Sequence, residues 1–146
     1  MTWQKIKVEI PETLTKQQRA DLADLIIEHI VERTENGVDK DGKKFPGYSK
    51  SYLASLDFKN AGKSPSKVDL TLSGDMLAAL ALLSERKGAL TIGFENGTRE
   101  NDKAEGNRLG SYGGDPNPKK ARDFLGIDRR KLAELIDHVT EGDDGG

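Results

Sequence analysis

The clearest periodicity of the chain lies in its middle. Apolar residues alternate with polar ones over Val68–Leu72 and again over Leu90–Phe94, which is the period of a strand with one buried face. Between the two lie apolar residues at helical spacing: Met76, Leu77, Leu80 and Leu83. The Ser73 hydroxyl is placed to accept an N–H group of the first helical turn, and Gly88 can adopt the left-handed conformation that commonly ends a helix. The pattern predicts a strand, a buried helix and a strand at the centre of the fold.

The N-terminal part shows the same two periods. Every second residue from Ile6 to Ile10 is apolar, and Pro11 follows, which predicts a strand at the edge or second position of the same sheet. Thr15 and Gln18 have the spacing of a capping box. Leucine and isoleucine then recur at helical spacing. We therefore expect a helix over Lys16–Thr34 whose apolar stripe covers the strands.

The C-terminal part predicts a last helix. Asp128 is placed to cap it, and one stripe of its surface is apolar: Leu132, Leu135, Ile136 and Val139. The segment before it, 95–127, is rich in turn residues and is expected to be irregular apart from a few helical turns over Asn101–Leu109. Residues 141–146 read EGDDGG and are expected to form a disordered tail.

These elements predict a single α+β domain over residues 1–140. It has a small, mostly antiparallel sheet packed by a long N-terminal helix, a central buried helix and a C-terminal helix, with long loops. A chain of 146 residues is the size of one domain. Because 34% of the residues are hydrophobic, 33% are charged and sixteen are glycine, the core is modest. We expect neighbouring molecules to complete its burial.

The formal net charge of −2 hides a basic segment. Between Lys40 and Lys67, seven lysines stand against two aspartates, inside an expected loop over residues 35–67. Ser49–Asp57 within it has the spacing of a short helix. A loop of this length in a compact domain is either functional or disordered. We favour a function because the segment holds a cluster of aromatic residues: Phe45, Tyr48, Tyr52 and Phe58.

Residue types that catalysis or metal binding would need do not form a site. There is no cysteine, which excludes disulfides and thiolate sites and suits a reducing cytosol. His29 and His138 lie on expected helices without a second ligand. Asp39 and Asp41 resemble part of a calcium loop, but its glutamate position holds Tyr48. We therefore predict no enzyme, no metal and no cofactor.

A second basic group surrounds the start of the last helix: Lys119, Lys120, Arg122, Arg129, Arg130 and Lys131. Cations in a first helical turn oppose the helix dipole, so either a partner or the nearby Asp123 and Asp128 would compensate them. Phosphate contacts would give DNA binding without sequence preference and with strong salt dependence. The residues alone leave open a partner surface and a small cytoplasmic nucleic-acid-binding protein.

Five short motifs follow one another along the chain: Gly42-x-x-Phe45-x-x-Tyr48-Ser49-x-x-Tyr52, Leu72-Ser73-Gly74-x-Met76, Ile92-Gly93-Phe94, Ala104-x-x-Asn107-x-x-Gly110 and Arg122-x-Phe124-Leu125-Gly126-Ile127. In this order they resemble the tailed-bacteriophage virion morphogenesis and tail-completion proteins, the small neck and head–tail joining subunits related to those of Mu-like phages. The resemblance runs from about Gly37 to Val139. The family commonly has histidine or glutamine beside the last glycine of the fourth motif, where this chain has Asn107-Arg108-Leu109.

The resemblance implies a structural subunit that does no covalent chemistry. It would assemble as a ring, six-fold or twelve-fold, at the head–tail junction, against other neck, portal-side or tail-tube proteins. Phe45, Tyr48 and Tyr52 are then expected at a subunit or partner contact, and Phe124 and Leu125 are expected to dock the last helix onto the core. Basic side chains would face an acidic partner or DNA in the channel: Lys40, Lys43, Lys44, Lys50, Lys119, Lys120, Arg122, Arg129 and Arg130.

No stretch approaches the roughly 20 apolar residues of a membrane span, and the first ten residues carry no apolar run typical of a signal peptide. We expect a soluble protein, made in the host cytoplasm and carried in the virion.

Overall fold

The computed structural model describes residues 3–45, 74–109 and 123–144. Within these ranges the chain forms a three-stranded sheet and four helices, an α+β fold as the sequence predicts. The expected strand Val68–Leu72, the expected short helix Ser49–Asp57, and both Tyr48 and Tyr52 lie outside the described residues.

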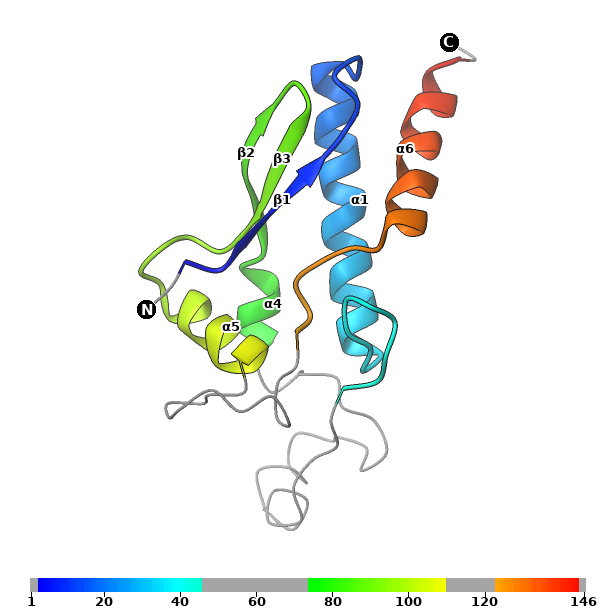
Figure 1. Cartoon of the computed structure of the whole chain (residues 1–146). Coiled ribbons are helices and arrows are strands. Elements are labelled where there is room, and N and C mark those ends of the chain that lie inside the picture. The colour runs from blue at the N-terminus through cyan, green and yellow to red at the C-terminus, as the bar shows by residue number, and fades with distance from the viewer. Residues whose placement is uncertain (1–2, 46–73, 110–122, 145–146) are drawn as a thin grey trace.

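The sheet is antiparallel, in the order β1-β3-β2 (Figure 1). β1 spans Lys5–Glu9, β2 Ala81–Arg86 and β3 Ala89–Gly93. The predicted N-terminal strand is therefore confirmed, and it lies at an edge. Its apolar residues turn toward the helices, where Val8 is 5% exposed.

A long helix, α1, covers one face of the sheet and begins and ends where its sequence predicts. It spans Lys16–Glu35. The Thr15 hydroxyl accepts the N–H of Gln18, and the Gln18 side chain accepts the N–H of Thr15, which confirms the capping box. The buried stripe of α1 includes Leu22, Ile26 and Ile30, each 0% exposed. Gly37, with φ of 79°, turns the chain out of the helix.

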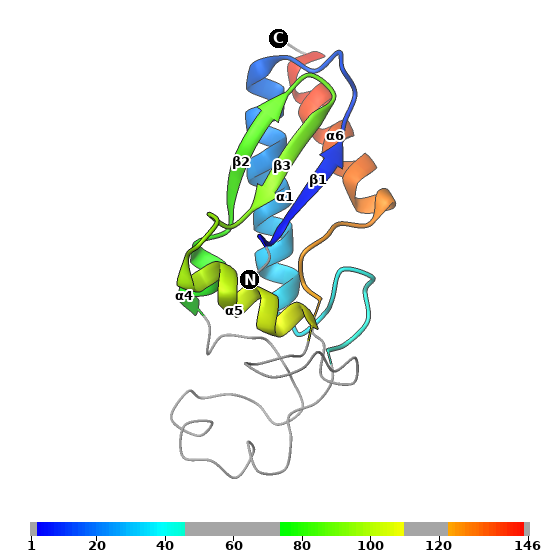
Figure 2. The ribbon, with the colours of Figure 1, turned by 60° about the vertical axis from the view of Figure 1, so that its left-hand side comes forward.

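The last helix, α6, spans Arg129–Asp144 and packs along α1 (Figures 1 and 2). Asp128 caps it, because its Oδ1 accepts the N–H of Lys131 at 3.0 Å. That hydrogen bond is the largest cause that lowers the pKa of Asp128. The helix continues past Thr140 to Asp144, so the first residues of the expected tail are helical.

The predicted central helix is wrong in its second half. Helix α4 spans only Gly74–Ala78, and the chain then enters β2. Lys87 and Gly88 form a two-residue hairpin turn between Arg86 and Ala89, and Gly88 has a φ of +86°. The run of apolar residues from Leu80 to Leu83 is compatible with both a helix and a strand. Pairing with β3 makes it a strand.

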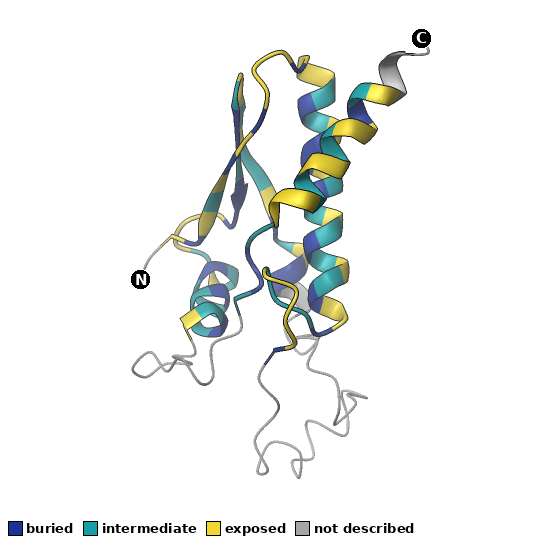
Figure 3. Cartoon of the chain, turned by 45° about the vertical axis from the view of Figure 1, so that its right-hand side comes forward, coloured by how far each residue is buried: buried dark blue, intermediate teal, exposed yellow. Residues whose placement is uncertain are grey.

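A further helix, α5, spans Arg99–Leu109 and lies beside α4 (Figure 1). It confirms the helical turns expected over Asn101–Leu109. Figure 3 shows buried residues where α1 faces the sheet and where α4 and α5 meet. None of the helices in the described ranges has both the length and the apolar character that crossing a bilayer requires.

The half-buried His29 lies on α1 near the start of α6. Burial is the largest cause that lowers its pKa from 6.5, followed by the positive charges of Arg33 and Lys131. The folded chain therefore binds a proton less readily than the unfolded chain. Below the unfolded pKa of 6.5, the free energy of unfolding should fall as the pH falls.

We expect His29→Gln to weaken this loss of stability between pH 7.5 and 5.5, measured by urea unfolding at each pH. His138→Gln, which removes the exposed histidine of α6, is the matched control. A wild-type chain whose unfolding free energy does not fall more steeply than that of His29→Gln would contradict the assignment.

Candidate subunit interface

Each of the five motifs contributes a buried residue to the core, although the motifs are far apart along the chain. Phe94 and Phe124 are each 0% exposed, and their rings pack edge to face with centroids 6.1 Å apart. Met76 is 0% and Asn107 6% exposed. The Asn107 amide donates to the Met76 sulfur at 3.7 Å and to the Lys103 carbonyl at 2.9 Å. Met76, Phe94, Phe124 and Leu125 all belong to the hydrophobic core of the fold, so Phe124 and Leu125 are core residues.

Two motif glycines stand where a side chain would collide. A Cβ on Gly93 would lie 2.4 Å from the Gln4 carbonyl oxygen, because β1 passes close to β3 there. A Cβ on Gly126 would lie 2.9 Å from the Cβ of Lys40. In both motifs the glycine allows two separate segments to approach each other.

The segment 123–126 is held by three cations from three different elements. The Arg33 guanidinium of α1 donates to the Phe124 carbonyl, and to the Gly126 carbonyl at 2.9 Å. The Arg108 Nε of α5 lies 2.8 Å from one Asp123 oxygen, and the Lys40 Nζ lies 3.1 Å from the other. We call Arg33, Lys40, Arg108 and Asp123 the anchor cluster.

Backbone and side-chain contacts extend the anchor cluster. The Lys40 N–H donates to the Asp123 carbonyl at 3.1 Å, and Arg108 also donates to the Gln4 side chain at 2.9 Å. Burial lowers the pKa of Arg33, which the carboxylates of Asp39 and Asp123 partly offset. An arginine remains charged throughout the physiological range, so α1 presents a half-buried positive charge to this segment.

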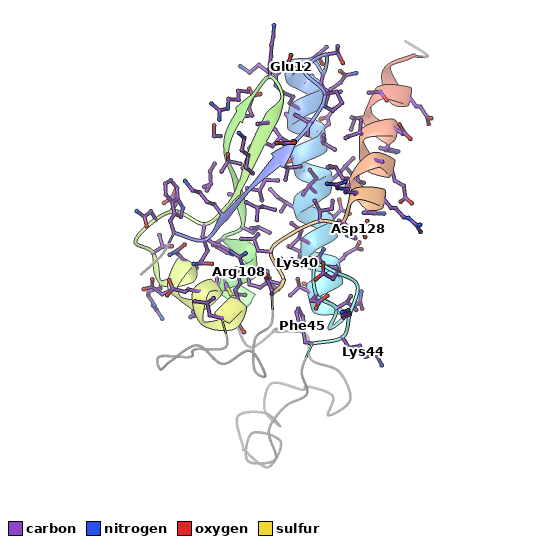
Figure 4. The ribbon with its side chains drawn as sticks, viewed as in Figure 1. Glu12, Lys40, Lys44, Phe45, Arg108 and Asp128 are labelled. Atoms are coloured by element: carbon purple, nitrogen blue, oxygen red, sulfur yellow. The ribbon has the colours of Figure 1, made fainter. Side chains whose placement is uncertain are left out.

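Two of the predicted surface residues are engaged inside the chain. Phe45 was expected at a partner contact, but it is 5% exposed and belongs to the core, so its ring is not offered to a partner. Lys40 was expected to face a partner or DNA; it pairs with Asp123 near the middle of the molecule (Figure 4), and its side chain is 41% exposed. Both contacts join segments that are distant in the sequence.

The other predicted site cations in the described ranges lie on the surface. Lys43 and Lys44 are exposed on a turn that Val38 and Lys44 close by an isolated bridge, and Figure 4 shows Lys44 pointing outward. Arg129 and Arg130 are exposed at the start of α6. Asp123, one of the two aspartates that could compensate these cations, is paired with Lys40 and Arg108. Lys50, Lys119, Lys120 and Arg122 lie outside the described residues.

The aspartates that resemble a calcium loop have a structural role. The Asp39 carboxylate accepts the N–H groups of Asp41 and Lys43, both at 2.9 Å, and Gly42 has a φ of +83°. In the described ranges, no group of three or more acidic or histidine side chains is placed to hold a metal ion.

A groove lies beside the free edge of β1. Its volume is about 710 Å³, and it lies between β1, the segment 125–128 and the first half of α6. Its apolar lining comes from all three: Ile6, Val8, Leu125, Ile127, Leu132 and Ile136. Sequence reasoning missed this groove, because its walls are far apart along the chain.

In comparisons with protein-family models, with curated proteins and with solved structures, nothing matched.

Removing the charge of Asp123 tests the anchor cluster. Asp123→Asn should lower the free energy of unfolding by about 1–2 kcal/mol, because Arg108 and Lys40 lose a charged acceptor that is part-buried. Urea unfolding followed by circular dichroism gives the value. Glu134→Gln, which removes the exposed partner of Lys131 on α6, is the control and should change stability by less than about 0.5 kcal/mol. Equal effects of the two substitutions would contradict the anchor role.

Proposed function

We propose that the chain is a structural subunit of a tailed-bacteriophage neck or tail-completion ring. It would join a filled head to a tail around the DNA channel, without covalent chemistry. One observation carries the proposal: five motifs stand in the order of that family, and each has a residue in the hydrophobic core. Phe94 with Phe124 and Met76 with Asn107 come from four separate motifs.

The distribution of contacts also supports an assembling subunit. Figures 1 and 4 place Phe45, α4, the end of α5 and the start of the segment 123–126 at the same end of the molecule. The described chain therefore borders residues 46–73 and 110–122 at this end. These two segments carry seven lysine and arginine residues against three aspartates. We propose that this end faces an acidic neighbouring subunit or the DNA.

The exposed lysines nearest to this end are Lys43 and Lys44. The described cations of the anchor cluster are engaged by Asp123 and by backbone carbonyls. The exposed lysines would suit either a ring subunit or the alternative, a small cytoplasmic protein that binds nucleic acid without sequence preference, and the experiment below separates the two.

Charge reversal of the two exposed lysines tests the proposal in the phage that encodes the chain. Without the chain, filled heads and finished tails should accumulate unjoined, as counted by electron microscopy. Wild-type protein supplied in trans should restore joining. Lys43→Glu with Lys44→Glu should restore it at least about tenfold less well, because an acidic surface or DNA would repel the new charges.

The matched control makes the same change in charge at the opposite end of the molecule. Lys16 starts α1 and Lys87 lies in the hairpin turn, and both are exposed. Lys16→Glu with Lys87→Glu should complement like the wild type. Normal joining in the absence of the chain would refute the neck function. Tight binding of a monomer to duplex DNA, with a steep dependence on salt, would instead support the nucleic-acid-binding alternative.

A further inference from the structure

The helix layer of this fold is wider than its sheet. α1 packs on β2 and β3, and α6 packs beside α1 at the β1 side. Two helices side by side are about 20 Å wide, whereas three strands at about 4.8 Å spacing are about 14 Å wide. The groove of about 710 Å³ lies between the edge of β1 and α6, where the helix layer extends beyond the sheet. Its size and position match one missing strand.

The edge of β1 that faces this groove has free backbone groups. The Ile10 N–H donates to the Gly88 carbonyl, and the Phe94 N–H donates to the Gln4 carbonyl. In an antiparallel ladder such pairs alternate along the strand, so the even-numbered residues of β1 bond to β3. The N–H and C=O groups of Lys5, Lys7 and Glu9 therefore point away from β3, and no other described strand pairs with them.

The two edges of the sheet differ in a way that favours pairing at β1. β2 contains a register shift between Leu82 and Ser84, and a bulge of this kind protects an edge from added strands. β1 pairs with β3 in unbroken register from Lys5 to Glu9. An edge strand that is regular and lies beside an apolar groove is the arrangement that accepts an extended segment.

We propose that this groove binds Val68–Leu72 of a second copy of the chain as a fourth strand beside β1. Apolar residues occupy every second position of that segment: Val68, Leu70 and Leu72. They would face Leu132 and Ile136 of α6. Asp69 would lie on the open face of the sheet, beside the exposed Lys5 and Lys7. The apolar face of the segment thus complements the apolar lining of the groove, and Asp69 complements the charge of Lys7.

A lone strand fits this site, whereas a whole sheet does not. If a second copy joined its own sheet to β1, its helix layer would come within about 5 Å of α6 by the spacings of packed strands and helices. Packed helices need about 8–10 Å between their axes. The partner must therefore be an isolated extended segment.

The position of α4 indicates that the segment comes from a neighbour. Leu72 is separated from Gly74, the first residue of α4, by Ser73 alone, and one residue spans at most about 3.6 Å. In Figure 2, α4 lies below β2, near the edge of the sheet opposite to α6. The segment of the same chain would have to cross the width of the sheet to lie along β1.

Exchange of a strand from each copy to the next is a heterologous contact, which closes into a ring when the rotation between copies allows it. The inference rests on the proposed ring function, since it names the contact by which that ring would close. It assigns the described part of the contact to β1 and α6, and the donated part to Val68–Leu72.

Cysteine cross-linking tests the contact without interference, because the chain has no cysteine of its own. Two full-length preparations are made, one with Lys7→Cys and one with Asp69→Cys or Thr71→Cys, and they are mixed under mild oxidation. We expect a disulfide-linked dimer that contains one copy of each, and little product from either preparation alone. Dimers of Lys7→Cys alone would overturn the proposal, because two β1 edges would then be meeting.

A doubly substituted chain separates the two sources of the strand. If Lys7→Cys and Asp69→Cys in one chain link within that chain at high dilution, the segment folds back in cis and the proposal is wrong. No cross-link in any combination, at a concentration where the wild type assembles, would also refute it.

Substitutions that block the groove give a second test that leaves the ladder with β3 intact. Lys7→Pro removes the outward N–H of β1, whereas Lys7→Ala keeps it, and proline is tolerated at the free side of an edge strand. We expect Lys7→Pro to lower the yield of mixed cross-link, measured with Glu9→Cys in place of Lys7→Cys, at least about tenfold below that of Lys7→Ala. Equal yields from the two folded variants would contradict the pairing.

The exposed Ala133 lines the groove, and its exposed neighbour Glu134 does not. Ala133→Trp should therefore reduce the cross-link at least about fivefold, and Glu134→Trp should leave it unchanged. This pair keeps the proposal testable if Lys7→Pro does not fold. Wild-type protein that joins heads to tails while all cross-links fail would refute this contact and leave the neck function standing. The reverse result would refute the neck function and retain the contact.

Discussion

The attachment of the segment 123–126 to the rest of the chain is the constraint on which the arrangement depends. The half-buried Arg33 of α1 binds the carbonyls of Phe124 and Gly126, while Asp123 takes Arg108 of α5 and Lys40. A half-buried guanidinium that loses its carbonyl acceptors destabilises the fold, because its N–H groups are only partly reached by water. This requirement fixes the path of the chain into α6, places Phe124 against Phe94, and sets the distance between α6 and β1. The groove beside β1 follows from that distance.

The modest core and the free sheet edge are consistent with the proposed assembly. The sheet has three strands, its outer face is polar, and β1 carries backbone groups that pair with no other described strand. An edge of this kind is a liability for an isolated protein and an advantage for a subunit that adds a neighbour's strand. The cations of the anchor cluster make contacts within the chain, whereas Lys43 and Lys44 are exposed near the end that borders residues 46–73.

Local sequence predicted the elements whose signals lie close together along the chain. The capping box of Thr15 and Gln18, the alternation in β1 and β3, and the Asp128 cap with its apolar stripe all appear as expected. Predictions failed where contacts between residues distant in the sequence determine the local structure. Pairing of Leu82 with Ile92 makes β2 a strand rather than a helix, and core packing takes Phe45 off the surface. Arg33 lies 91 positions from Phe124, so no window of the sequence reveals the anchor cluster or the groove.

The central claim is that the chain completes its fold with copies of itself, and the mass of the wild-type protein in solution tests it most directly. Light scattering is measured over a wide range of concentrations at physiological salt. The account predicts a mass that rises with concentration from that of the 16.0 kDa chain toward six or twelve copies. A mass that stays at 16.0 kDa up to the highest attainable concentration would contradict it.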